Sequence, residues 1–458
     1  MENNLSLEIL HSAQKVVEEA EVFWISSRKI PVHFEANHLK RVDNKESTTV
    51  ALRIVKEGRI GLATATGGDK LGGKVSPSPN LSFQGGGMSQ DLLDMAVETS
   101  QFGLPANFQF PSLTSYPQVN IFDPGVAGVG VEKMIELGEE LITKVREHAA
   151  DILCEVEVSK GIYSFHIINS RGGEVSYDKS LFNISLEGLI IQDTDMLFVG
   201  DSESSCCLPS AIDILAGRVI RQLELAKEKA TVSTKLLPII FTPRGVANAL
   251  LIPMILGFNG KMVLEGASPL KNRLGEQVFD KGLNLWDDAT IAYGAGSRPC
   301  DDEGVPSQRI SLITQGEVAN FLYDLQTAAL AGTQSNGHGE RARGGFPNPA
   351  ISSLIIDEGS VSFRDMVGDM KEGLIVEELI GTGQGDVLSG DFGGNVLLGY
   401  KVENGEIVGR VKDTMISGNV YQVLKEPPVM GREARWVNGI LRTPPLYCPQ
   451  VSVAAKGS

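Results

Sequence analysis

The chain has 458 residues, of which 42% are hydrophobic and 21% charged, a composition that excludes general disorder and supports a sizeable core. Its formal net charge of −16 argues against an extensive binding surface for the phosphates of nucleic acids. Glycine contributes 51 residues and aromatics only 6%, which favours tight turns and hairpins over a helical bundle. The 5 cysteines form no C-x-x-C pair and are read as free thiols of a reducing compartment.

No segment predicts export or membrane insertion. The N-terminus lacks a basic region followed by an apolar run, so no signal peptide is expected. The most apolar window, residues 245–258, contains a proline and is shorter than the roughly 20 residues that span a bilayer. The sequence therefore predicts a soluble cytoplasmic protein that binds neither membrane nor nucleic acid.

Residues 1–108 predict an N-terminal α+β domain. Apolar residues at spacings of three and four over 9–20 predict an amphipathic helix. Alternating apolar residues on both sides of Glu57-Gly58 predict a β-hairpin. Ser89 is a candidate N-cap for a second helix.

Residues 109–232 predict a middle α+β domain. It begins with a connector rich in proline and glycine, which marks the boundary. Helices are expected over 131–145 and 212–226, with short strands between them at 152–159, 164–168, 174–177 and 181–191. This order of elements loosely repeats that of the first domain.

Residues 233–458 predict a C-terminal domain dominated by strands. Asn404-Gly405 between two alternating runs is a strong hairpin signal, and Ser362 with Asp365 has the spacing of a helix capping box. The expected fold class is therefore α+β, with N-terminal α/β units of paired strands and helices followed by a mostly antiparallel, β-rich C-terminal domain.

The residues alone show no self-evident active site. The sequence contains no G-x-S-x-G elbow and no calcium-binding loop. Zinc hydrolases of the helix type need two histidines four or five positions apart, but His33 and His38, five apart, lie in an extended stretch that sends their side chains to opposite faces. Asp301-Asp302-Glu303 could hold a hard cation, but a solvated acidic turn is the preferred interpretation. His338 lies between two glycines and is interpreted as a residue of a surface loop, with a site as the alternative.

Several segments, taken in sequence order, resemble the TldD/PmbA family. They are Gly275-Glu276-Gln277-Val278, residues 301–309, Phe321-Leu322-Tyr323-Asp324, Ser335-Asn336-Gly337 with Arg341, Gly390-Asp391-Phe392 and residues 402–407. Residues 50–64 are similar to the first domain of that family. The similarity extends over nearly the whole chain, and the order of the motifs makes it specific.

The resemblance implies a chain of the PmbA (TldE) type, which shares the fold of TldD but lacks its zinc ligands. TldD-type chains carry His-Glu-x-x-x-His on a helix and a cysteine near the C-terminus. Counting back from Gly275 places Leu251 and Leu256 at the two histidine positions and Ile252 at the glutamate position. These side chains have no lone pair to offer zinc. No metal or other cofactor is expected, and the chain is not expected to be catalytic alone.

Two further sequence features agree with this assignment. No histidine lies between His166 and His338, so a shift in the alignment does not restore the motif. The ligand cysteine is expected around 432–435, where the sequence has none, and Cys448 is not its equivalent. Because Pro253 removes a backbone donor, the helix that replaces the zinc helix is expected to be short, bent or broken near residues 251–253.

The resemblance also implies partners. A PmbA-type subunit pairs with a TldD-like zinc peptidase subunit in a cytoplasmic homo- or heterodimeric assembly that processes or degrades small or unfolded peptides. The family's older label, modulator of DNA gyrase, is then an indirect effect. Two alternatives stay open: a homodimeric peptide-binding protein without proteolytic activity, and a hydrolase that uses another nucleophile or metal.

A loop over residues 335–345 supplies the candidate peptide-binding residues. Strand addition would give such a protein tolerance of peptide sequence, because main-chain hydrogen bonds carry the affinity. Two arginines in this loop could anchor a peptide carboxylate. The candidates are Asn336, His338, Arg341 and Arg343, and the alternative is that the arginines pair locally with acidic neighbours.

Overall fold

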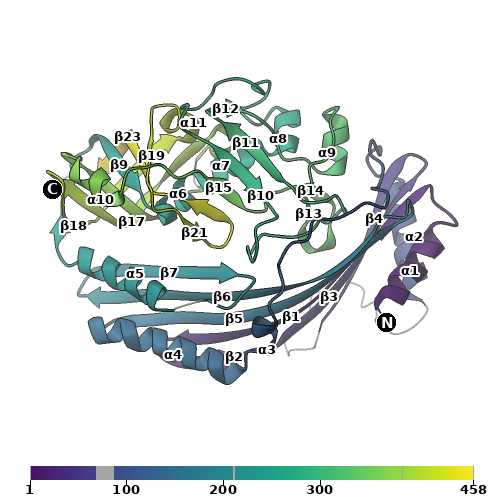
Figure 1. The fold of residues 1–458 in the computed structure, drawn as a ribbon, viewed down its shortest axis with the longest axis horizontal. Coiled ribbons are helices and arrows are strands. Elements are labelled where there is room, and N and C mark those ends of the chain that lie inside the picture. Colours follow the sequence, from purple (N-terminus) through teal and green to yellow (C-terminus); the bar gives the residue numbers. More distant parts are fainter. Residues whose placement is uncertain (1, 69–86, 210–211, 384, 457–458) are drawn as a thin grey trace.

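The computed structural model describes residues 2–68, 87–209, 212–383 and 385–456. In Figure 1 a long curved sheet, formed by the first half of the chain, lies beneath a strand-rich C-terminal part. The α+β prediction is confirmed, with strand-helix units first and a strand-rich region after them. Among the described residues, no helix is both long and apolar enough to cross a bilayer.

The curved sheet has seven strands in the order β4-β3-β1-β5-β6-β7, with β2 paired to β1. All of its pairings are antiparallel. Because β1 pairs with both β3 and β5, segments on either side of the 109–130 connector share one sheet. The division at residue 108 stays a prediction. The strands are β1 Glu19–Glu35, β2 His38–Val42, β3 Lys45–Lys56, β4 Arg59–Gly68, β5 Leu153–Asn169, β6 Glu174–Gln192 and β7 Asp195–Ser205.

Helices cover the sheet at its two ends. The helices α1 (Glu2–Ala13) and α2 (Met88–Ser100) pack on β1, β3 and β4. The helices α4 (Val131–His148) and α5 (Ile212–Leu225) pack at the β5–β7 end, after the short α3 (Pro124–Gly128). In Figure 1 these two groups lie at opposite ends of the sheet.

Two local predictions in this region were wrong. The first helix was expected over residues 9–20 but ends at Ala13, because the chain from Glu19 onward forms strand β1. Ser89 does not cap α2, whose N-cap is Gly87 and which has no capping side chain. The Ser89 hydroxyl instead donates to Glu8 at 3.1 Å and joins α2 to α1.

The C-terminal part contains two larger sheets and a short hairpin. Their orders are β16-β9-β23-β19-β17-β18-β8 for the eight-stranded sheet, where β20 also pairs with β23, and β12-β11-β10-β15-β22-β21 for the six-stranded sheet. The strands are β8 Lys229–Ala230, β9 Lys235–Phe241, β10 Leu285–Asp288, β11 Arg309–Thr314, β12 Glu317–Val318, β13 Gly339–Arg341, β14 Pro347–Pro349, β15 Leu354–Ile356, β16 Glu372–Ile380, β17 Asp391–Glu403, β18 Glu406–Val411, β19 Thr414–Asn419, β20 Val429–Met430, β21 Arg435–Val437, β22 Leu441–Thr443 and β23 Leu446–Ala455.

Short helices connect and cover these sheets. They are α6 Pro243–Ala249, α7 Leu251–Phe258, α8 Gly260–Glu265, α9 Leu325–Leu330, α10 Phe363–Gly368 and α11 Val420–Val423, with 3₁₀ turns η1 Ala342–Gly344 and η2 Val387–Ser389. The capping-box prediction is confirmed, since the Ser362 hydroxyl accepts from the Asp365 amide at the start of α10. The β17–β18 hairpin is also confirmed: Asn404 and Gly405 have φ of 50° and 82°, as a type I′ turn requires.

The apolar segment around Pro253 is a broken helix, as expected. Leu250 ends α6 and also precedes the first residue of α7. Pro253 has no amide hydrogen to donate to the carbonyl of Ala249, so a single continuous helix would lose a hydrogen bond at this point.

Two helical glycines test how tightly α4 is packed. A Cβ added at Gly138 in α4 would lie 2.3 Å from Cε2 of the buried Phe34 ring, whereas one at Gly217 in α5 meets nothing within 4 Å. We expect Gly138→Ala to lower the free energy of unfolding by about 1–3 kcal/mol through overpacking. Gly217→Ala should raise it by about 0.5–1 kcal/mol. Urea unfolding followed by circular dichroism measures the free energy of unfolding of both variants. Equal changes in the two would contradict the close packing of Gly138 against Phe34.

Candidate functional site

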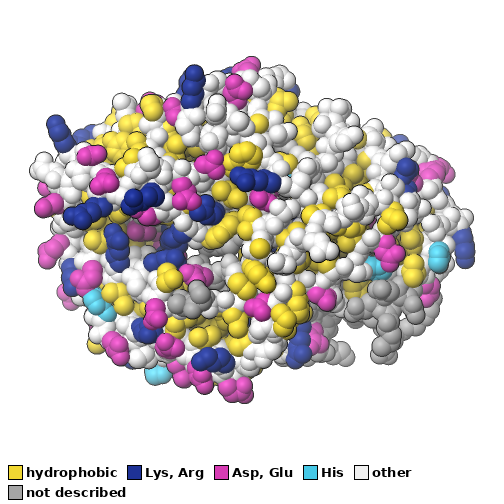
Figure 2. Space-filling model, in the orientation of Figure 1, with side chains coloured by type: hydrophobic (Ala, Val, Ile, Leu, Met, Phe, Trp, Pro, Cys, Tyr) yellow, Lys and Arg dark blue, Asp and Glu magenta, His cyan; other side chains and the backbone are white. Residues whose placement is uncertain are grey.

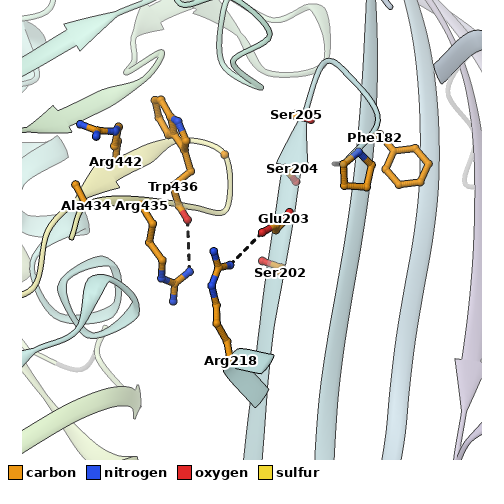
Figure 3. A pocket seen from close by; sticks show the side chains of 12 residues that line it. Phe182, Ser202, Glu203, Ser204, Ser205, Arg218, Ala434, Arg435, Trp436 and Arg442 are labelled. Atoms are coloured by element: carbon orange, nitrogen blue, oxygen red, sulfur yellow. Dashed lines mark hydrogen bonds and ion pairs between the residues drawn. The ribbon is translucent and has the colours of Figure 1, made fainter. Parts of the chain in front are cut away.

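A cavity of about 300 Å³ lies between β7 of the curved sheet and the β21–β22 hairpin of the C-terminal part. Figure 3 shows serines and Glu203 of β7 on one side and Arg435, Trp436 and Arg442 on the other, with Arg218 of α5 reaching in from below. The cavity is lined by Phe182, Ser202, Glu203, Ser204, Ser205, Pro209, Arg218, Ala434, Arg435, Trp436, Gly439 and Arg442.

The β7 side of the cavity is a sheet edge. At Gly200 the amide donates to Gln222 Oε1 at 2.8 Å and the carbonyl accepts from Gln222 Nε2 at 3.1 Å, so the backbone of this residue faces away from β6. Backbone groups of an antiparallel strand alternate in direction, so Ser202 and Ser204 face the same way as Gly200. The Ser202 amide is already bonded to Asp201 Oδ1. Ser204 therefore presents its main chain towards the cavity.

The opposite side is also a sheet edge, because β21 ends the six-stranded sheet. The backbone oxygen of Trp436 accepts a hydrogen bond of 3.5 Å from Arg435 Nη1 (Figure 3). Ser202 Oγ lies 3.2 Å from Asn438 Oδ1 and joins β7 to the turn between β21 and β22. Two strand edges thus border one cavity, an arrangement that suits an extended chain.

Ion pairs neutralise most of the charge around the cavity. Arg218 lies 3.1 Å from Glu203 and 3.5 Å from Asp201, and Arg435 lies 3.2 Å from Asp201. Burial lowers the pKa of Arg435, and Asp201 opposes that shift. Figure 2 shows basic side chains with acidic ones among them where the C-terminal part meets the β7 end of the sheet.

Asp301-Asp302-Glu303 is not the solvated turn that the sequence suggested. All three residues are buried. Asp301 accepts hydrogen bonds from the amides of Glu303, Val305 and Gly339, and Glu303 Oε1 lies 2.6 Å from Arg53 Nη1. Burial raises the pKa of Asp301 to about 6 and that of Glu303 to about 8. The solvated interpretation failed because the partners are provided by distant segments.

The structure also places the candidate peptide-binding residues. The Asn336 side chain is fixed by two hydrogen bonds to the main chain: it accepts one from the Tyr323 amide and donates one to the Phe321 carbonyl. His338 is buried, with ring nitrogens 2.9 Å from Asn336 Oδ1 and 3.0 Å from Asp287 Oδ1. The surface-loop interpretation of His338 was therefore wrong.

Of the two arginines of this loop, the structure describes the side chain of Arg341. Arg341 is buried, pairs with Glu21 of β1 and donates to the carbonyls of Asp302 and Gly345. Arg343 lies in η1, and its side chain is outside the described part of the structure. The structure thus brings Asn336 and His338 together and directs Arg341 into an ion pair. Their role in peptide binding stays a prediction.

The positions at which counting back from Gly275 places the family's zinc motif lie on α7. Leu251 is buried, Leu256 is partly buried and Ile252 is exposed. Their hydrocarbon side chains have no donor atom, so the residues present do not fit a zinc ion. In the described ranges, no group of three or more His, Cys, Asp or Glu side chains is arranged to hold a metal. Cys448 is buried in β23.

Comparison with known proteins agrees with this fold. The family profile for the PmbA/TldA metallopeptidase C-terminal domain matches residues 234–455, and that for PmbA/TldA metallopeptidase domain 1 matches residues 20–72. A metalloprotease TldD homolog of Haemophilus influenzae is 30% identical over 417 residues, covering 84% of this chain and 83% of that protein.

Solved structures share the whole architecture. TldE from Thermococcus kodakarensis superposes with a TM-score of 0.84 at 22% identity, covering 98% of this chain and 99% of that one. A protein from Thermotoga maritima superposes with a TM-score of 0.85 at 19% identity, covering 99% and 100%. Fold and sequence together define a metallopeptidase-like protein. The chain belongs to the TldD/PmbA family.

Sequence reasoning did not find the cavity at β7. The run Asp201-Ser202-Glu203-Ser204-Ser205 is entirely polar, so it lacks the alternation that predicts a strand. The available signal was the preceding Phe198-Val199, two residue types that are enriched in strands. Arg218 and Trp436 carried no motif that would have linked them to this strand.

The geometry of Arg341 predicts a structural contribution. Arg341→Ala would leave the carboxylate of Glu21 with one fewer cation in a buried environment. We expect the free energy of unfolding to fall by about 3–5 kcal/mol. Arg28→Ala, which removes an exposed pair with Glu46, should change it little. Guanidinium unfolding compares the two variants. An unchanged free energy of unfolding in Arg341→Ala would show that the pair with Glu21 does not stabilise the fold.

Proposed function

We propose that this chain is the PmbA (TldE)-like subunit of a TldD/TldE-type peptidase assembly, and that it binds peptide without using zinc. The observation that carries the proposal is the hydrocarbon chemistry of Leu251, Ile252 and Leu256 at the motif positions. A chain without metal donors there has no means to polarise a peptide carbonyl in the way that zinc peptidases do. Peptide hydrolysis is assigned to a TldD-like partner.

The cavity between β7 and β21 supports the peptide-binding part of the proposal. Main-chain groups at Ser204 and Trp436 border it from two sheet edges. Strand addition to such an edge uses main-chain hydrogen bonds, so it tolerates many peptide sequences. The local ion pairs of Arg218 and Arg435 leave little net charge to select for charged peptides.

The names of relatives support the partner part. One relative is a metalloprotease TldD homolog, and a structure with the same fold is TldE. We propose that this chain works in the cytoplasm with a TldD-like zinc subunit on small or unfolded peptides. Proteolysis would then require both chains, and the oligomer would be a heterodimer or a larger assembly built from one.

A homodimeric peptide-binding protein is the second candidate. It is favoured by the fact that one chain supplies both edges of the cavity, since β7 and β21 belong to the same molecule. In that case peptide binding needs no second type of subunit. A hydrolase with a different metal or nucleophile is the third alternative.

Metal and activity measurements separate these candidates. We expect the purified chain to contain no stoichiometric zinc by inductively coupled plasma mass spectrometry, with or without added zinc. It should cleave no unstructured peptide alone, and it should form a complex with peptidase activity when mixed with the TldD-like subunit of the same organism. Zinc at one equivalent or cleavage by the chain alone would refute the proposal. Peptide binding without complex formation would favour the homodimer.

Strand addition at β7 predicts the effect of removing one amide hydrogen. Ser204→Pro removes the outward-facing donor at an edge position where proline is tolerated. We expect it to weaken binding of a fluorescein-labelled unstructured peptide by roughly tenfold, since one hydrogen bond to the peptide is lost. Ser204→Ala keeps the amide and serves as the control. Fluorescence anisotropy measures both, and equal affinities would argue against binding along β7.

A further inference from the structure

A second cavity, of about 410 Å³, lies where the β3–β4 end of the curved sheet meets the C-terminal part. In Figure 1 this is the end of the sheet beside α9 and β14, away from the cavity at β7. Its volume falls in the range of about 300–1,000 Å³ that is usual for ligand sites. The residues around it come from the loop after α2, from α8 and α9, and from β14.

The rim of this cavity is apolar and exposed. Phe102 and Leu104 are 86% and 71% exposed, and Leu330 is 56% exposed. Leu264 and Phe346 complete the rim and are also exposed. Single exposed apolar residues are ordinary, but a group of large ones around a cavity marks a binding surface.

Hydrogen bonds hold the rim in place. The Ile60 amide donates to the Leu104 carbonyl at 2.9 Å, and the Ala106 amide donates to the Gly58 carbonyl at 2.8 Å. Gln326 of α9 bridges the two walls, donating to the Pro105 carbonyl and accepting from the Asn107 amide. The exposed apolar side chains therefore project from a backbone that is fixed on both sides of the cavity.

The inner wall is acidic. Glu303 and Asp324 line the cavity but are almost fully buried, so they lie at its floor. Two cations also line the cavity: Arg53, which is shared between Glu303 and Glu21, and Lys261, which like Arg53 opposes the rise in the pKa of Asp324. Burial raises the pKa of Asp324. Burial also raises the pKa of Glu303, with Asp301, Asp324 and Glu21 adding to the shift and Arg53 opposing it. The lining thus holds the acidic residues Glu265, Glu303 and Asp324 against the basic residues Arg53 and Lys261, so an entering cation would meet one more acidic group than basic groups.

We propose that this cavity binds an apolar group that carries a protonated amine, most simply the N-terminal residue of a peptide with a large hydrophobic side chain. The side chain covers the apolar rim formed by Phe102, Leu104 and Leu330. The ammonium group donates to the carboxylate of Asp324. This site goes beyond the function proposed above, because it depends neither on the missing zinc ligands nor on the β7 edge.

Four probes test the chemistry of the ligand. Isothermal titration calorimetry should detect binding of Leu-Phe-Gly-Gly with a free amino terminus and of 2-phenylethylamine. Acetylation of the peptide should weaken its binding at least about tenfold, because a charge-assisted hydrogen bond is lost. 3-Phenylpropionate should not bind, since it brings a negative charge to an acidic floor. Equal affinity for the free and acetylated peptides would overturn the proposal. Binding of the amine but not of the peptide would assign the site to free amines.

Variants of the floor and rim locate the binding site. Asp324 caps α9 by accepting from the Thr327 amide, and asparagine caps helices equally well, so Asp324→Asn should fold normally. It should weaken peptide binding by roughly tenfold. Asp386→Asn, at the cap of η2, is the matched control and should not change binding. Unchanged affinity in Asp324→Asn would overturn the assignment.

Two further measurements distinguish a ligand site from a subunit interface. Entry of an ammonium group should displace protons from the floor near pH 7, so the binding enthalpy should vary with the ionisation enthalpy of the buffer. Leu330→Ser should weaken peptide binding without changing the oligomeric state in size-exclusion chromatography with light scattering. If Leu330→Ser dissociates an oligomer and leaves amine binding intact, the rim is a subunit interface and the proposal fails.

Discussion

The ion pair between Arg53 and Glu303 fixes how the two halves of the molecule meet. Arg53 lies in β3, and Glu303 lies in the C-terminal part, 250 positions away in the sequence. The guanidinium also contacts Glu21 of β1, and its Cζ lies 4.8 Å from the ring centres of Phe108 and Phe110. Burying these charges is costly unless each is paired, so the sheet and the C-terminal part can meet in few other arrangements.

This contact also accounts for the positions of both cavities. The Glu303 carboxylate accepts from the amide of Leu325 at 2.7 Å, which anchors the start of α9 against the curved sheet. Arg341 forms a second connection, 320 positions from its partner Glu21. With one end of the sheet held in this way, its other end is placed beside β21, where strand edges border the first cavity. The ion cluster forms the floor of the second.

The parts that sequence predicted correctly depend on local chemistry. The turn at Asn404-Gly405, the cap at Ser362 and the helices α4 and α5 follow from residues close to each other in the chain.

The features that the sequence did not predict depend on partners that are distant in the chain. Strands β5 and β6 are each continuous where two short strands were expected, because neighbouring strands pair along their full length through polar stretches. The acidic run at residues 301–303 was interpreted as solvated because Arg53, the cation that pairs with Glu303, lies 250 positions away in the sequence.

The chemistry of the two cavities suggests a division of recognition within one chain. The first is bordered by main-chain groups, and its charges are already paired, so the strand addition proposed there would distinguish an extended backbone from a folded one but not one side chain from another. The second has an apolar rim and an acidic floor, so the binding proposed there would select the charge and size of a single group. Together they would favour unfolded peptides with hydrophobic amino termini. Neither form of recognition needs a metal. The hydrocarbon residues that α7 carries where counting back from Gly275 places the zinc motif are therefore compatible with the proposed role, in which this chain binds peptides for another subunit to cleave.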